Sequence, residues 1–155
     1  MEIKFRGKQV DSGEWYVGFY AKGRHGGHYI LSEYNGLATN AHSVDGDTLG
    51  RCADLKDTDG VEVFEGDVLR QKTVHEFKGS NPSAWERRYI VRFGRCDFRP
   101  RETGCDTLGF FLADIDGYSF IPKGIASLEW DNAEGYDFEV IGNIHDNPEL
   151  LEVAA

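Results

Sequence analysis

The strongest constraint on the fold is a series of short runs in which apolar and polar residues alternate. Residues 3–6 and 88–93 alternate in this way, and residues 14–20 are rich in aromatic and β-branched side chains. A period of two places alternate side chains on opposite faces of a strand. Further strand candidates lie at 28–31, 66–69, 108–112, 125–130 and 138–144. The sequence therefore predicts a mainly β fold of antiparallel strands.

Glycine and aspartate mark the turns between these runs. Asp57-Thr-Asp-Gly60 has the composition of a tight turn, because Asp and Gly tolerate positive φ. Gly66 is expected to bend or bulge the start of the next strand. Residues 33–47, rich in Asn, Gly, Ala and Asp, are expected to form an irregular exposed loop. Within one domain spanning 1–155, this loop best separates an N-terminal β-piece, 1–47, from a barrel-like piece, 48–155.

One short helix is expected near the C-terminus, over residues 148–153. Pro148 suits a first helical position, Asn147 can cap it, and Glu149 lies at the positive end of the helix dipole. No apolar run approaches the roughly 20 residues of a membrane-spanning helix. The first residues lack the apolar stretch of a secretory signal. We therefore expect a cytoplasmic protein with no membrane contact.

Charge is distributed unevenly along the chain. The formal net charge is −10, but residues 70–101 carry +6, whereas residues 1–69 carry −5 and residues 102–155 carry −11. The basic and acidic parts can lie side by side, within the fold or across an interface between copies of the chain. Alternatively, the basic segment can bind a nucleotide or a nucleic-acid backbone. We favour the first interpretation, because charge blocks alone carry no chemistry.

The best candidate for a ligand surface lies in the basic segment, where basic and aromatic residues interleave. Aromatic rings can stack on bases, and they also build cores and interfaces between subunits, so both roles stay open. The candidate ligand-binding residues are Trp85, Arg87, Arg88, Tyr89, Arg92 and Arg95.

Motifs for metal binding and catalysis fit the sequence poorly. If Asp57 began a calcium loop, the glycine required at position 6 would be Glu62 and the glutamate required at position 12 would be Val68. The three cysteines form no Cys-x-x-Cys pair, and His25-Gly-Gly-His28 lacks further ligands nearby. We expect no metal, no cofactor and no enzymatic activity.

A phosphodiesterase-type enzyme acting on a nucleotide is the alternative. It requires histidines to converge with two carboxylates spaced to share one face of a strand. The histidines are His25, His28 and His42. The carboxylate pairs are Asp114 with Asp116 and Glu129 with Asp131.

Two separated segments carry a resemblance to a known family. Leu55–Leu69 contains Asp59-Gly60 and Phe64-Glu-Gly-Asp-Val68, and Phe138–Leu151 contains Glu139-Val-Ile-Gly-Asn-Ile-His-Asp-Asn-Pro-Glu-Leu150. Together with Ile3-Lys-Phe-Arg-Gly7 and Gly13-Glu-Trp15…Gly18, they resemble the YopX family of phage and prophage proteins, and along the chain the blocks follow the order of that family. Residues 51–54 depart from the family pattern.

The resemblance implies a small Src-homology-like barrel in the C-terminal half and a phage or prophage origin. It implies no activity, because the family is functionally uncharacterised. We therefore expect a non-enzymatic accessory protein, a binding or regulatory module that forms homo-oligomers. A host protein or an anionic small molecule is the expected partner, and nucleic acid is the less favoured one.

Overall fold

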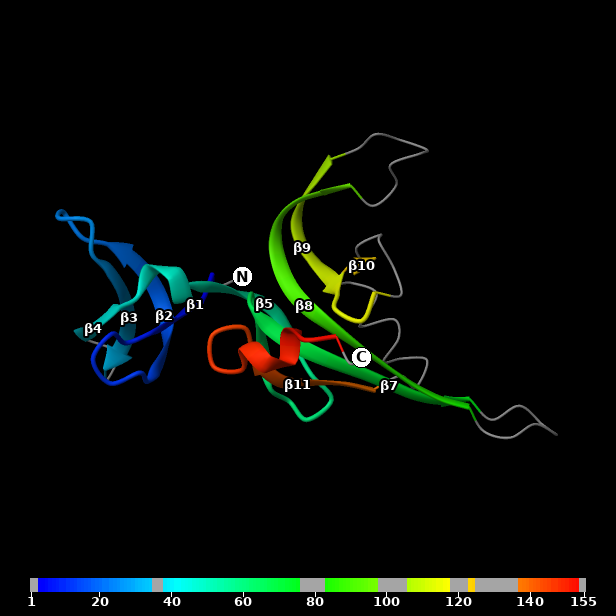
Figure 1. Cartoon of the computed structure of the whole chain (residues 1–155). Helices are drawn as coiled ribbons and strands as arrows, with labels where there is room; N and C mark the ends of the chain where they lie inside the picture. Colours follow the sequence, from blue (N-terminus) through cyan, green and yellow to red (C-terminus); the bar gives the residue numbers. More distant parts are fainter. Residues whose placement is uncertain are drawn as a thin grey trace. The chain divides into compact units, whose positions relative to one another are not determined.

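The fold consists of antiparallel β-sheet with short 3-10 helices (Figure 1). The mainly β prediction is thereby confirmed. The chain divides into two compact units, Met1–Ala53 and Asp54–Ala155, and each is described by itself. The structure is a computed structural model that describes residues 3–34, 38–75, 83–97, 106–117, 123–124 and 137–153.

The first unit is an antiparallel sheet in which β4 returns to the end of β1. The sheet has six strands in the order β4-β3-β2-β1-β5-β6, and β4 to β1 with the first part of β5 belong to this unit. A single bridge joins Gln9 to Val44, and the amide of Asp45 donates to the carbonyl oxygen of Lys8 at 2.9 Å. The elements are β1 (Phe5–Lys8), β2 (Trp15–Lys22), β3 (His28–Tyr34), β4 (Ala38–Val44), the 3-10 helix η1 (Gly46–Thr48) and β5 (Gly50–Lys56), which continues into the second unit.

One face of this sheet is closely packed. Ile30 is fully buried on it and Val44 is 4% exposed. The ring of Tyr16 stacks on that of His42, with 3.7 Å between the ring centroids. A Cβ atom on Gly7 would lie 2.8 Å from Cγ2 of Val44, so the close approach of β4 to β1 requires glycine here.

The second unit contains a five-stranded antiparallel sheet in the order β10-β9-β8-β7-β11. The buried apolar side chains on one face of this sheet are Leu69, Tyr89, Val91, Leu112 and Phe138, and the polar Gln71 is buried beside them. Figure 1 shows β8 and β9 as long, bent neighbours. The elements are β6 (Glu62–Phe64), β7 (Asp67–His75), β8 (Ser83–Asp97), β9 (Asp106–Asp114), β10 (Lys123–Gly124), β11 (Asp137–Asn143) and the 3-10 helix η2 (Pro148–Leu151).

The predicted turn at Asp57–Gly60 is present, and it covers the outer edge of β11. Oδ2 of Asp57 accepts a hydrogen bond from the amide of Val140 at 3.0 Å. The hydroxyl of Thr58 donates to the carbonyl oxygen of Phe138 at 2.8 Å and accepts from the amide of the same residue at 3.1 Å. These contacts satisfy backbone groups that an edge strand otherwise exposes. The two separated segments of the sequence thus form one structural element.

Two local predictions are wrong. The irregular loop expected at 33–47 contains β4 and η1, because hydrogen bonding to β3 outweighs the low β-propensity of Ala, Asn and Ser. The helix expected over 148–153 is the four-residue 3-10 helix η2. Asn147 precedes it as predicted, but its side chain makes no cap; its Oδ1 accepts from the amide of Asn143 instead, at 3.3 Å.

A closed barrel is not found among the described residues, since the order from β10 to β11 does not return on itself. The Src-homology-like barrel expected in the C-terminal half stays a prediction. The strand expected at 125–130 lies outside the described residues. In the described part of the chain, none of the helices is long and apolar enough to cross a membrane.

Candidate functional site

All six candidate ligand-binding residues lie on β8, but they do not form one compact site. Alternation along the strand places Trp85, Arg87, Tyr89 and Arg95 on one face and Arg88 and Arg92 on the other. A rise of about 3.3 Å per residue separates Trp85 from Arg95 by about 33 Å along the strand. A small ligand cannot contact the whole set at once.

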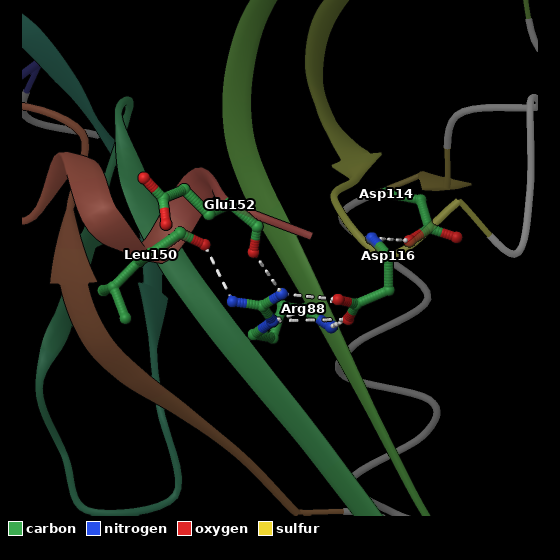
Figure 2. A network of polar contacts seen from close by, with 5 residues as sticks. All are labelled: Arg88, Asp114, Asp116, Leu150 and Glu152. Carbon is green, nitrogen blue, oxygen red and sulfur yellow. Dashed lines mark hydrogen bonds and ion pairs between the residues drawn. The ribbon is translucent and has the colours of Figure 1, made fainter. Parts of the chain in front are cut away.

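Arg88 is the centre of a hydrogen-bonded network (Figure 2). Its Nη2 donates to Oδ1 of Asp116 at 2.6 Å, and its Nε donates to the same oxygen at 3.1 Å. Nη1 donates to the carbonyl oxygen of Leu150 at 2.8 Å, and Nη2 donates to that of Glu152 at 3.0 Å. The guanidinium therefore joins β8 to the turn after β9 and to the C-terminal segment.

The network is mostly shielded from solvent. The side chains of Arg88 and Asp116 are 16% and 17% exposed. The hydrogen bond to Asp116 raises the pKa of the guanidinium above its usual value, while burial opposes this shift. Arg88 therefore stays protonated, and its donors are largely used within the second unit. This geometry favours a structural role for Arg88 over ligand binding.

The other candidates differ in how they are placed. Tyr89 is 4% exposed and belongs to the core. Arg92 and Arg95 are exposed on opposite faces of β8. Trp85 and Arg87 are half-buried neighbours on one face, and the guanidinium carbon of Arg87 lies 5.4 Å from the indole centroid. Ligand binding by these residues stays a prediction, and the Trp85–Arg87 pair has the most suitable geometry for it.

Among the described residues, two ion pairs join the basic and acidic segments inside the second unit. Arg70 on β7 pairs with Glu139 on β11, and Arg88 pairs with Asp116. Parts of the two segments thus lie side by side within this unit. A third pair lies within the basic segment itself, where Lys72 Nζ is 3.8 Å from Glu86 Oε2.

Asp114 and Asp116 do not share a strand face as expected. Strand β9 ends at Asp114, and Asp116 lies in the following turn, where its amide donates to Oδ1 of Asp114 at 2.8 Å. Oδ2 of Asp116 also accepts from the backbone amide of Arg88 at 2.9 Å. The spacing argument fails because it requires the strand to continue through both residues. Asp116 is the partner of Arg88 that sequence reasoning missed, since no local pattern links residues so far apart.

Two histidines of the first unit, His28 and His42, take part in sheet contacts, and His25 lies in the turn before β3. Nδ1 of His28 is 2.8 Å from the hydroxyl of Tyr20, and Nε2 of His42 is 3.1 Å from the hydroxyl of Ser32. Within the described ranges, no group of three or more His, Cys, Asp or Glu side chains could hold a metal ion. Glu129 and Asp131 lie outside those ranges. Convergence of the histidines with these carboxylates stays a prediction.

Comparison with known proteins defines the family. Residues 4–152 match the family described as YopX protein. The chain belongs to the YopX family. The family resemblance carried by the two separated segments is thereby confirmed.

A solved structure is similar to this YopX family member over almost its whole length. Protein EF1440 from Enterococcus faecalis shares 19% sequence identity and has a TM-score of 0.50, covering 98% of this chain and 99% of that chain. At this identity the likeness concerns the fold alone. No curated protein matches the chain.

Proposed function

We propose that this YopX family member is a non-enzymatic accessory protein of a phage or prophage that acts as a binding or regulatory module. Its origin is inferred from the family resemblance. The binding role is supported chiefly by the Trp85–Arg87 pair, in which a cationic guanidinium lies next to an aromatic indole ring. A guanidinium group can bind phosphate or carboxylate groups in a bidentate manner. An anionic small molecule is therefore the ligand class that we infer.

The placement of other reactive side chains supports a non-enzymatic role. The carboxylate of Asp116 pairs with Arg88, and that of Asp57 accepts hydrogen bonds from the backbone. These groups have structural partners, so they are poorly placed to exchange protons with a substrate. Ligand binding therefore fits the described side chains better than hydrolysis.

A thermal-shift screen tests the proposed binding. The probes are inorganic phosphate, a nucleoside triphosphate, a cyclic dinucleotide and a single-stranded oligonucleotide at low salt. A ligand present at 100 times its Kd stabilises the folded protein by about 2.7 kcal/mol, which corresponds to a rise in Tm of about 5–11 °C. Arg87→Met should abolish the rise, whereas Arg92→Met, on the other face of β8, should preserve it. If none of the probes raises Tm, anion binding at this site is refuted.

The same screen separates a nucleotide from a nucleic acid. Binding of the oligonucleotide alone, with an affinity that falls steeply as salt increases, would favour the nucleic-acid alternative. Binding of the nucleotides would favour a small-molecule signal. An unchanged Tm together with binding of a purified host protein would favour protein recognition over the binding of a small anion.

We further propose that the sheet of the second unit belongs to a small Src-homology-like barrel, as the family resemblance implies. Closure requires a hydrogen-bonded ladder that links the β10 side of the sheet to the β11 side. Backbone hydrogen bonds mapped by NMR test this directly. A sheet with two open edges would contradict the barrel.

A further inference from the structure

Exposed apolar side chains gather on the β1–β2 hairpin of the first unit. Val17 and Phe19 on β2 are each 42% exposed. Val17 lies opposite Arg6 on β1, and Phe19 lies opposite Leu31 on β3, so these side chains share one face of the sheet. This is the face opposite the buried Ile30. We define the hairpin face by its residues Arg6, Lys8, Trp15, Val17, Phe19 and Leu31.

One end of the hairpin face is cationic. The guanidinium carbon of Arg6 lies 4.8 Å from the indole centroid of Trp15, and Nζ of Lys8 lies 6.0 Å from it. Aromatic and arginine side chains beside an apolar strip are typical of protein interfaces. Because Arg6 covers the indole and Val17 and Leu31 are aliphatic, the face suits an apolar protein segment better than stacked bases. The cations favour a partner segment that also carries carboxylates.

The C-terminal segment of the same chain has this chemistry. Leu151 is 37% exposed and Val153 is 62% exposed. Glu149 and Glu152, on either side of Leu151, are exposed carboxylates. We call residues 146–153 the C-terminal turn. It combines apolar and acidic side chains in a short segment, which complements the hairpin face.

Hydrogen bonds order the backbone of the C-terminal turn before any partner binds. Arg88 donates to the carbonyl oxygens of Leu150 and Glu152, as Figure 2 shows. Asn143 Oδ1 accepts from the amides of His145 and Asp146 at 3.0 and 2.9 Å. A segment ordered before binding loses less conformational entropy when it binds. The turn is therefore a pre-formed binding element.

We propose that the hairpin face of one copy of this chain binds the C-terminal turn of a second copy. Leu151 and Val153 pack against Val17 and Phe19, and the carboxylates of the turn lie near the cationic end of the face. When the exchange is reciprocal, two identical contacts close a two-fold symmetric dimer. This inference goes beyond the proposed ligand binding and does not depend on it.

Light scattering across a wide range of protein concentrations tests the proposal. The wild-type protein should show a mass above the 17.4 kDa of one chain, and the association should weaken as salt increases. A face variant, Val17→Thr with Phe19→Thr, and a turn variant, Leu151→Ser with Val153→Ser, should each raise the dissociation constant at least about tenfold. The control is Val61→Thr, which alters a side chain that is 49% exposed and belongs to neither surface.

Mixing the two variants identifies the pair of surfaces. The face variant keeps an intact turn and the turn variant keeps an intact face, so a mixed dimer retains one native contact. The mixture should therefore associate more tightly than either variant alone. A wild-type monomer overturns the proposal, as does association that the turn variant leaves unchanged. Circular dichroism checks that both variants fold. If the wild-type protein is a monomer but an anion still raises its Tm, the proposed ligand binding stands while the proposed dimer does not.

Discussion

Replacing Arg88 by methionine should destabilise the second unit strongly. Methionine keeps the apolar stem but removes the donors to Asp116, Leu150 and Glu152. Removing one partner of a buried ion pair costs about 3–5 kcal/mol. Because Asp116 is 17% exposed and still accepts from the backbone amide of residue 88, we expect the lower end, about 3 kcal/mol.

Chemical and thermal denaturation measure this loss. A change of about 3 kcal/mol lowers Tm by about 6–12 °C in a protein of this size. Hydrogen exchange provides a local readout, because the amides of Leu150 and Glu152, which donate within η2, should exchange faster. Arg92→Met is the matched control. Arg92 lies on the same face of β8 but is exposed, so its loss should change stability by less than about 0.5 kcal/mol.

A double-mutant cycle that combines Arg88→Met with Asp116→Asn isolates the interaction free energy of this pair. The coupling free energy between positions 88 and 116 should be about 1.5–3 kcal/mol. Equal destabilisation by Arg88→Met and Arg92→Met would refute the structural role of the network. A coupling free energy near zero would show that Asp116 is not the main partner of Arg88.

Three further predictions concern single side chains. Asp57→Ala removes acceptors for the amides of Asp59, Val61 and Val140, so we expect a loss of about 2–4 kcal/mol in denaturation experiments; a loss below about 0.5 kcal/mol would contradict this role. Asp54 has a φ of 55°, so Asp54→Ala should cost about 1 kcal/mol while Asp54→Gly should be nearly neutral; equal effects would exclude backbone strain. The hydrogen bond to Glu14 raises the pKa of Tyr16 above 10.0. The stabilising contribution of this hydrogen bond is therefore present below pH 10.0 and is lost as the pH rises through the pKa of Tyr16 in the folded protein. Glu14→Gln should lower the pKa of Tyr16 in an absorbance titration, and an unchanged titration curve would argue against the contact.

Features set by neighbouring residues could be predicted from the sequence. The turn at Asp57–Gly60 follows from local backbone chemistry, and Gly60 has the positive φ, 85°, that the prediction requires. Gly66 likewise has a φ of 90°. On β8, the alternation at 88–93 predicts that Tyr89 and Val91 share one face, and both side chains are buried in the structure. The period of two is a strong signal there because Tyr89 and Val91 are buried, whereas Arg92 on the other face is exposed.

Features set by distant residues could not be predicted. Strand β4 has few β-forming residues, and its pairing with β3 is what makes it a strand. The charge of Arg88 suggested a ligand site, because sequence alone does not show that Asp116 and the C-terminal carbonyl groups surround it. The hairpin face cannot be predicted from the sequence for a similar reason. Val17 and Phe19 belong to a run that predicts a strand, but the run does not show which face stays exposed.

The contacts between the turn at residues 57–58 and β11 also bear on how the chain folds during synthesis. They join residues about 80 positions apart, Thr58 with Phe138 and Asp57 with Val140. Pairings over such separations form late, because closing a long loop costs entropy before any contact rewards it. The strands of the first unit, in contrast, pair mostly with their neighbours in sequence. During translation the sheet of the first unit can therefore fold early, while the second unit must wait until β11 has left the ribosome.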